Sequence, residues 1–252
     1  MLSARVAFIT GGSRGVGAAI ARTLAKDGVR IALVGRDEAA LARVAAETNG
    51  LALVADVTDR GALLAAIEKA QRELGPIGIS VHNAGIAPSA PLGATDDATW
   101  DRTMATNVKP AFWLAQWLVP KMIAAGFGRI IHVASNAGLT GYAYTSAYCA
   151  SKHALVGFTR ALAAEVARTP VTVNAVCPGF LESEMTDGTI ATIASKTNRT
   201  PQEARAYLES LSPQKRLIQT TEVAHVVSML CADEGRALHG TAIPIDGGQV
   251  MT

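Results

Sequence analysis

Short apolar runs alternate with longer stretches of helical periodicity along the whole chain. The apolar runs are typical of strands buried on both faces of a parallel sheet. Strands are predicted at Val6–Thr10, Ile31–Val34, Leu51–Ala55, Ile79–Asn83, Arg129–Ala134, Val171–Val176 and Ala242–Ile245. Helices are predicted at Val16–Asp27, Glu38–Glu47, Arg60–Glu73, Thr99–Val119, Ser146–Arg168 and Glu222–Cys231. The pattern predicts an α/β fold: one Rossmann-type, doubly wound parallel sheet of about seven strands, with helices on both faces.

No linker, repeat or low-complexity tract divides the chain, so residues 1–252 are expected to form a single dinucleotide-binding catalytic domain. One irregular stretch, at about 184–213, interrupts the alternation. Segments of this length in compact domains are often lids, and we expect a helical, mobile flap over the substrate. The alternative is a surface insertion with no role.

A glycine-rich turn, Thr10-Gly11-Gly12-Ser13-Arg14-Gly15-Val16-Gly17, follows the first predicted strand. Exposed N–H groups and the positive end of the next helix can hold a pyrophosphate there. The spacing is Gly-x3-Gly-x-Gly rather than G-x-G-x-x-G, and such a turn alone is a weak signal that also fits an ordinary loop.

Cofactor preference is predicted from the end of the second strand. A NAD-binding unit places an acidic residue near this point, whereas this chain has Gly35 followed by Arg36. A guanidinium can bind a 2′-phosphate through two hydrogen bonds, and Arg14 can reach the same region. We therefore expect NADP(H) rather than NAD(H), the alternative being that Arg36 is a solvated residue and Asp37 only caps the next helix.

A proton-transfer group is predicted downstream. Tyr148 and Lys152 share one face of a predicted helix, and Ser135 follows a predicted strand. A nearby ammonium would favour the phenolate and lower the pKa of Tyr148 from about 10 towards neutral pH. The Ser135 hydroxyl could orient a substrate carbonyl.

Taken in order, these motifs resemble the short-chain dehydrogenase/reductase family across nearly the whole chain. The resemblance also covers Asp56-Val57, Asn83-Ala84-Gly85, Asn107, Pro178-Gly179, Ser183 and Ile245-Asp246-Gly247-Gly248, with His82 in place of the usual Asn and Ser183 where Thr is commoner. The His82 difference puts a local contact between strands in doubt, but not the chemistry.

The resemblance implies a role for each matching residue. Asn107, inside a helix with Trp113 and Leu114, would hold a water that connects Lys152 to solvent. The implied catalytic residues are Asn107, Ser135, Tyr148 and Lys152. The implied cofactor-binding residues are Gly11, Ser13, Arg14, Gly15, Val16, Gly17, Arg36, Asp56, Val57, Asn83, Ala84, Gly85, Tyr148, Lys152, Pro178, Gly179 and Ser183.

Composition agrees with this class. The chain is 49% hydrophobic and 17% charged, which suits a large core, and its net charge of +2 argues against a nucleic-acid binder. The chain has no run of 18 apolar residues, so no membrane span is expected. The N-terminus does not resemble a signal peptide. No metal site is expected. Three cysteines give no disulfide framework, which favours a reducing cytoplasm.

Within the family, the chain most resembles reductases of 3-oxoacyl thioesters carried on acyl carrier protein or coenzyme A. The substrate candidates are Asn136, Leu139, Tyr142, Phe180, Leu181 and Met185. The long flap favours a bulkier or coenzyme-A-bound substrate or a polyketide-type ketone. Arg129 and Arg168 could meet an acidic carrier protein, although ordinary solvated charges are the simpler interpretation.

The expected activity is reduction of a ketone by NADPH, with Tyr148 giving the proton. The alternatives are an NAD(P)-dependent secondary alcohol or hydroxyacyl-CoA dehydrogenase that works oxidatively, and a non-catalytic cofactor-binding protein. A homotetramer is expected, because the family implies it and because several large apolar residues exceed what one sheet face needs. These residues are Phe112, Trp113, Trp117, Leu155, Phe158 and Leu162.

Overall fold

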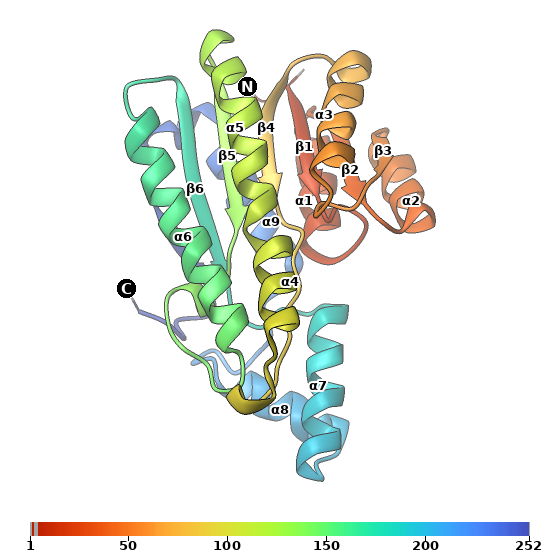
Figure 1. Cartoon of the computed structure of the whole chain (residues 1–252), viewed down its shortest axis with the longest axis vertical. Coiled ribbons are helices and arrows are strands. Elements are labelled where there is room, and N and C mark those ends of the chain that lie inside the picture. The colour runs from red at the N-terminus through yellow and green to blue at the C-terminus, as the bar shows by residue number, and fades with distance from the viewer. Residues whose placement is uncertain (1, 3–4, 252) are drawn as a thin grey trace.

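The structure, a computed structural model, describes residues 2 and 5–251. In that part of the chain, seven parallel strands form one sheet in the order β3-β2-β1-β4-β5-β6-β7 (Figure 1). The order reverses next to β1, as in Rossmann folds, where ligands bind beyond the carboxyl ends of the strands. The strands are β1 (Val6–Thr10), β2 (Arg30–Gly35), β3 (Leu51–Val54), β4 (Ile77–His82), β5 (Gly128–Val133), β6 (Val171–Pro178) and β7 (Ala242–Ile245). The predicted fold class is confirmed.

Nine α-helices connect or follow these strands within the described residues. They are α1 (Gly15–Lys26), α2 (Glu38–Thr48), α3 (Arg60–Leu74), α4 (Asp97–Asn107), α5 (Lys109–Ala124), α6 (Ser146–Val166), α7 (Glu184–Thr197), α8 (Pro201–Ser210) and α9 (Thr220–Cys231). Three short 3-10 helices complete the described part, at Leu92–Ala94, Asn136–Gly138 and Asp233–Ala237.

Two apolar layers hold the helices against the sheet. Alternate residues along β1 point to opposite faces, so Ile9 packs with α1, α2 and α9, while Phe8 packs with α3, α5 and α6. Both side chains are fully buried, as are Ile31 and Leu33 in β2. Burial on both faces explains why these strands are continuous apolar runs.

The predicted helix Thr99–Val119 is wrong in one respect, because the structure divides it into α4 and α5 at Val108. Pro110 lies in the first turn of α5, where its missing N–H costs no helical hydrogen bond. That proline could not have continued the α4 ladder. Asn107 is therefore the last residue of one helix, while Trp113 and Leu114 belong to the next.

The irregular stretch forms α7 and α8, which pack on each other beyond the carboxyl ends of the strands (Figure 1). Each helix has its own N-terminal cap. Ser183 accepts from the Thr186 amide, and Thr200 and Glu203 form a reciprocal capping box. These caps make the stretch locally helical despite its weak apolar periodicity.

The apolar surface available for assembly is smaller than predicted from the sequence. Leu155 and Leu162 are buried within the subunit at 0% and 8% exposure, because α6 turns this face onto the sheet. Phe112 is 48% exposed and meets Phe158 edge to face.

Among the helices that the structure describes, none combines the length and the apolar character that crossing a membrane requires.

Candidate active site

The glycine turn between β1 and α1 has the shape of a phosphate cradle. Gly11 and Gly15 have φ angles of +64° and +54°, in the left-handed region that favours glycine. A Cβ at Gly17 would lie 2.2 Å from the Gly11 carbonyl oxygen, whereas a Cβ at Gly15 would meet no atom within 4 Å among the described residues. The turn is therefore packed on its inner side and open above Gly15, which fits close approach of a dinucleotide pyrophosphate.

Thr10 and Asn83 fasten this turn to β4. The Asn83 amide donates from Nδ2 to the carbonyls of Thr10 and Gly11, at 3.1 and 3.0 Å. The backbone amides of Asn83 and Ala84 donate to Thr10 Oγ1. The Asn-Ala-Gly segment thus supports the cradle from below.

Both predicted phosphate-binding arginines are paired with carboxylates. Arg36 lies 3.7 Å from Asp56, and Arg14 lies 3.0 Å from Glu184 at the start of α7; Asp56 is partly buried, and the other three side chains are largely exposed. Hydrogen bonds from Thr58, helped by Arg36, lower the pKa of Asp56. Val57 is buried beside it.

Ser135 and Lys152 come together at the carboxyl end of β5. Ser135 is 9% exposed and donates to the carbonyl of Pro178, while Lys152 is 5% exposed and donates from Nζ to the carbonyl of Val133 at 2.9 Å. Burial lowers the pKa of Lys152 to about 8. The fold explains the meeting, because α6 follows β5 and lays its buried face along the sheet.

Tyr148 lies on the same face of α6, one turn before Lys152, whose Nζ is 5.7 Å from the phenol ring centre. The expectation that the ammonium lowers the pKa of Tyr148 is wrong for the chain without cofactor. Burial raises the pKa of Tyr148, and a hydrogen bond with Ser135 opposes the rise. The ammonium is held at the Val133 carbonyl, so its effect on the phenol does not exceed that of burial.

Asn107 closes the site from the end of α4. Its fully buried side chain binds both backbone groups of Ile86 and donates to Ser151 Oγ at 2.9 Å. A Cβ at Gly85 would lie 3.2 Å from Asn107 Oδ1 and 3.6 Å from Lys152 Nζ, so Gly85 borders both side chains. The backbone carbonyl of Asn107 faces His82 Nε2 at 3.0 Å, a contact that the sequence did not reveal.

The segment after β6 borders the candidate catalytic residues on the side of β6. Gly179 packs tightly on Asp246, since a Cβ there would lie 2.8 Å from the Asp246 Cβ. The Ser183 hydroxyl caps α7, which leaves its predicted contact with the cofactor a proposal. Pro178 accepts from Ser135, so this segment adjoins the candidate catalytic residues.

The predicted substrate residues do not form one continuous lining. Tyr142 and Phe180 meet edge to face, with ring centres 6.2 Å apart, and Leu139 is partly buried nearby in a cluster with Leu155. The other three predicted residues have further contacts: Asn136 lies beside the Tyr142 hydroxyl and donates to Asp246 and Gln249, Leu181 packs against the core, and Met185 is 55% exposed.

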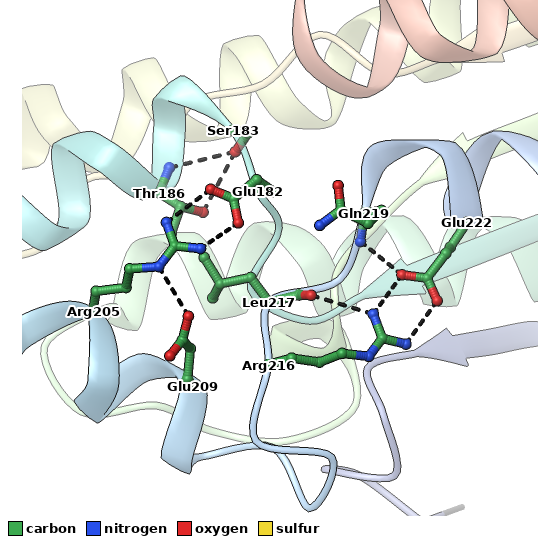
Figure 2. Close-up of polar contacts among 9 residues, drawn as sticks. All are labelled: Glu182, Ser183, Thr186, Arg205, Glu209, Arg216, Leu217, Gln219 and Glu222. Atoms are coloured by element: carbon green, nitrogen blue, oxygen red, sulfur yellow. Dashed lines mark hydrogen bonds and ion pairs between the residues drawn. The ribbon is translucent and has the colours of Figure 1, made fainter. Parts of the chain in front are cut away.

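Two arginine clamps near this edge escaped the sequence analysis (Figure 2). Arg205 of α8 binds Glu182 with both terminal nitrogens, at 2.8 and 2.5 Å, and donates from Nε to Glu209. Arg216 binds Glu222 in the same forked way, at 2.7 and 2.8 Å. The first clamp ties the flap to the segment that begins it, and the second fixes the start of α9.

The doubly wound sheet, the glycine turn and the Ser-Tyr-Lys group define a nicotinamide-dependent oxidoreductase. The short chain dehydrogenase family profile matches residues 5–194 of 252, and the chain belongs to this family. The family and the enzyme class predicted from the sequence are confirmed.

Several known proteins are similar to this chain along nearly their whole length. The chain is 36% identical to a ketoacyl reductase of the granaticin polyketide synthase of Streptomyces violaceoruber, with 96% of this chain and 92% of the relative covered. It is 33% identical to the 3-oxoacyl-[acyl-carrier-protein] reductase of Escherichia coli (98% of each covered) and 36% identical to galactitol 2-dehydrogenase of Cereibacter sphaeroides (99% and 96%). A crystal structure of an actinorhodin polyketide ketoreductase variant with NADPH superposes with a TM-score of 0.94 at 31% identity, covering 97% of each chain.

Proposed function

We propose that this chain is an NADPH-dependent ketoreductase that reduces the ketone of a 3-oxoacyl thioester to a 3-hydroxyacyl thioester. The observation that carries the proposal is the convergence of Ser135, Tyr148 and Lys152 beside the open glycine turn, with Gly85 in reach of both Asn107 and Lys152. Relatives named as 3-oxoacyl and polyketide ketoreductases support the substrate class.

Each candidate catalytic side chain has a defined task in this mechanism. With its pyrophosphate held at the glycine turn, NADPH would supply the hydride from its reduced nicotinamide. The hydroxyls of Ser135 and Tyr148 hold the substrate carbonyl oxygen and stabilise its developing negative charge. Tyr148 then gives its proton to that oxygen, and the Lys152 ammonium stabilises the phenolate that remains. Because burial raises the pKa of Tyr148, the free enzyme holds the phenol in its protonated form, which suits a proton donor.

The preference for NADPH over NADH is part of the proposal. Arg36 and Arg14 are exposed cations near the turn, and their present partners are the partly buried Asp56 and the exposed Glu184. A 2′-phosphate carries more charge than either carboxylate and accepts forked hydrogen bonds, so it can displace Asp56 and Glu184. A solved relative that binds NADPH supports the same choice.

We assign substrate binding to the region around Tyr142 and Phe180, where Phe180 packs against the flap at about 184–213, within a single catalytic domain. The carrier of the acyl group, either acyl carrier protein or coenzyme A, would approach this region from the solvent. Arg129 is not a docking residue, because it is 3% exposed and lies on the Phe127 ring next to Asp233. Arg168 remains a candidate for such contact.

A second function is favoured by one relative, the galactitol 2-dehydrogenase, which implies oxidation of a secondary alcohol. A cytoplasmic homotetramer stays a proposal, supported by three free cysteines and by the exposed ring of Phe112 on α5. Light scattering that finds a stable monomer at micromolar concentration would contradict the assembly.

The test of the proposed function is a substrate panel followed by NADPH absorbance. It contains acetoacetyl-CoA, a carrier-protein analogue, cyclic ketones and, with NADP+ or NAD+, simple and sugar alcohols. We expect the highest kcat/KM with a 3-oxoacyl thioester. Turnover of alcohols alone would favour the second function, oxidation of a secondary alcohol. No turnover of any substrate in the panel would contradict both proposed functions.

A further inference from the structure

His82 is the last residue of β4, at the carboxyl end of the strand. Its side chain is 2% exposed, and each ring nitrogen has one polar neighbour. Nδ1 lies 3.4 Å from Thr10 Oγ1, and Nε2 lies 3.0 Å from the backbone carbonyl oxygen of Asn107. The ring therefore spans the distance between the glycine turn and the candidate catalytic asparagine.

The surrounding donors fix the tautomer of this ring. A carbonyl oxygen can only accept, so Nε2 must carry the hydrogen. Thr10 Oγ1 already accepts the amides of Asn83 and Ala84, so its own hydrogen is free to go to Nδ1. Burial keeps the ring neutral, with the pKa of His82 lowered to about 4. The result is a directed line of hydrogen bonds from Thr10 through His82 to Asn107.

The neighbouring His132 does not share this role. It is the register partner of His82 on β5, and the two rings meet edge to face at 6.3 Å. Its Nδ1 lies 2.8 Å from Thr159 Oγ1, which donates onward to the carbonyl of Leu155. His132 thus donates into the middle of α6, away from the glycine turn.

The His82–Asn107 contact matters because the side chain of Asn107 is already held by other hydrogen bonds. Its amide already binds Ile86 and Ser151, and Ser151 in turn donates to the carbonyl of Tyr148. A rotation of the Asn107 peptide would therefore move groups on either side of Tyr148 and Lys152. The Asn83–Ile86 segment links the turn to the Asn107 side chain, whereas His82 links it to the Asn107 backbone carbonyl.

We propose that His82 is a positioning residue whose Nε2–H holds the Asn107 carbonyl in register with the glycine turn. Through it, the turn that binds the cofactor and the asparagine beside Lys152 form one rigid unit. The catalytic consequence rests on the proposed ketoreductase function, whereas the hydrogen-bond line does not.

The matched variants are His82→Gln and His82→Asn. A glutamine amide reaches the place of Nε2, so it can still donate to Asn107, whereas an asparagine amide reaches only the place of Nδ1. We expect His82→Gln to keep kcat within about 3-fold and His82→Asn to lose about 10-fold, the effect of one net hydrogen bond. The His82→Asn variant should also shift the pH profile of kcat, with the KM for ketone nearly unchanged. Equal behaviour of the two variants in kcat and pH profile would overturn the proposal.

A readout independent of turnover uses the wild-type chain. Nitrogen-15 NMR of His82 should show a protonated Nε2 and an accepting Nδ1 between pH 6 and 8, and the Nδ1 resonance should shift when NADPH binds. The opposite tautomer, or NADPH binding without a shift, would refute the coupling. If the substrate panel failed while these signals appeared, the ketoreductase proposal would fall and the hydrogen-bond line would stand.

Discussion

Lys152 donates a hydrogen bond from its ammonium to the backbone carbonyl of Val133, at 2.9 Å. Val133 is the last residue of β5, and Ser135 follows two residues later. The bond fixes the ammonium to the sheet while leaving it one helical turn from Tyr148. The lysine is therefore positioned by the strand that also presents the serine.

Replacing Tyr148 with phenylalanine removes only the hydroxyl. We expect kcat for ketone reduction to fall about 10³-fold, because a positioned acid typically contributes roughly 10² to 10⁴ in rate. NADPH affinity, measured by fluorescence titration, should stay within about 3-fold, since the glycine turn is intact. Turnover close to that of wild type would remove Tyr148 from the mechanism.

The proposed preference for NADPH assigns the 2′-phosphate to Arg36 and Arg14, the latter paired with Glu184. We expect Arg36→Ala to weaken NADPH binding about 10-fold or more and to leave NADH binding nearly unchanged, since one charge-assisted contact to the 2′-phosphate is lost. Isothermal titration at two salt concentrations measures both, and the difference should shrink at high salt.

Glu184→Gln is the complementary change in this pair. It frees Arg14 from its partner at 3.0 Å, so NADPH should bind more tightly while NADH is unaffected. Tighter binding of NAD+ than of NADP+ by the wild type would contradict the cofactor assignment.

The Arg205–Glu182 clamp is expected to hold the flap. In Arg205→Met, α8 loses its forked contact to Glu182, just before α7, so KM for substrate should rise several-fold with kcat less affected, and cleavage by protease within 184–213 should accelerate. Arg216→Met is the matched control, because its equally forked partner Glu222 lies in α9 (Figure 2). Equal proteolysis of the two variants would show that the clamp does not control the flap.

Much of this architecture follows from local patterns. The strands could be predicted because burial on both faces requires uninterrupted apolar residues, as in Phe8 and Ile9. The glycine turn could be predicted because Gly11 and Gly15 need backbone angles that other residues rarely adopt. Such signals depend on neighbours in sequence, and they survive without knowledge of the tertiary contacts.

The remaining features depend on contacts between distant segments. The sequence shows that Tyr148 and Lys152 share a helix face, but the balance between burial and charge appears only when the depth of the phenol is known. Arg205 contacts Glu182 although α7 separates them in the sequence, and His82 contacts Asn107 although the β4–α4 connection and α4 lie between them in the sequence. The break at Val108 had one visible sign, Pro110, which the apolar pattern of the predicted helix obscured.

Two buried neutral histidines should make the fold sensitive to acid. Burial lowers the pKa of His82 to about 4 and of His132 to about 3, below the value of about 6.5 in an unfolded chain. The unfolded state therefore binds more protons below pH 6.5, and the stability that the neutral rings provide is present above that pH and lost as the pH falls. At pH 5 the loss is about 2 kcal/mol for each ring, measurable by urea unfolding at pH 7 and pH 5. His132→Gln should reduce the difference in unfolding free energy between pH 7 and pH 5 by about that amount. His153→Gln, on the surface of α6, is the control and should leave this difference unchanged. An identical difference in all three proteins would show that the buried rings do not set the acid response.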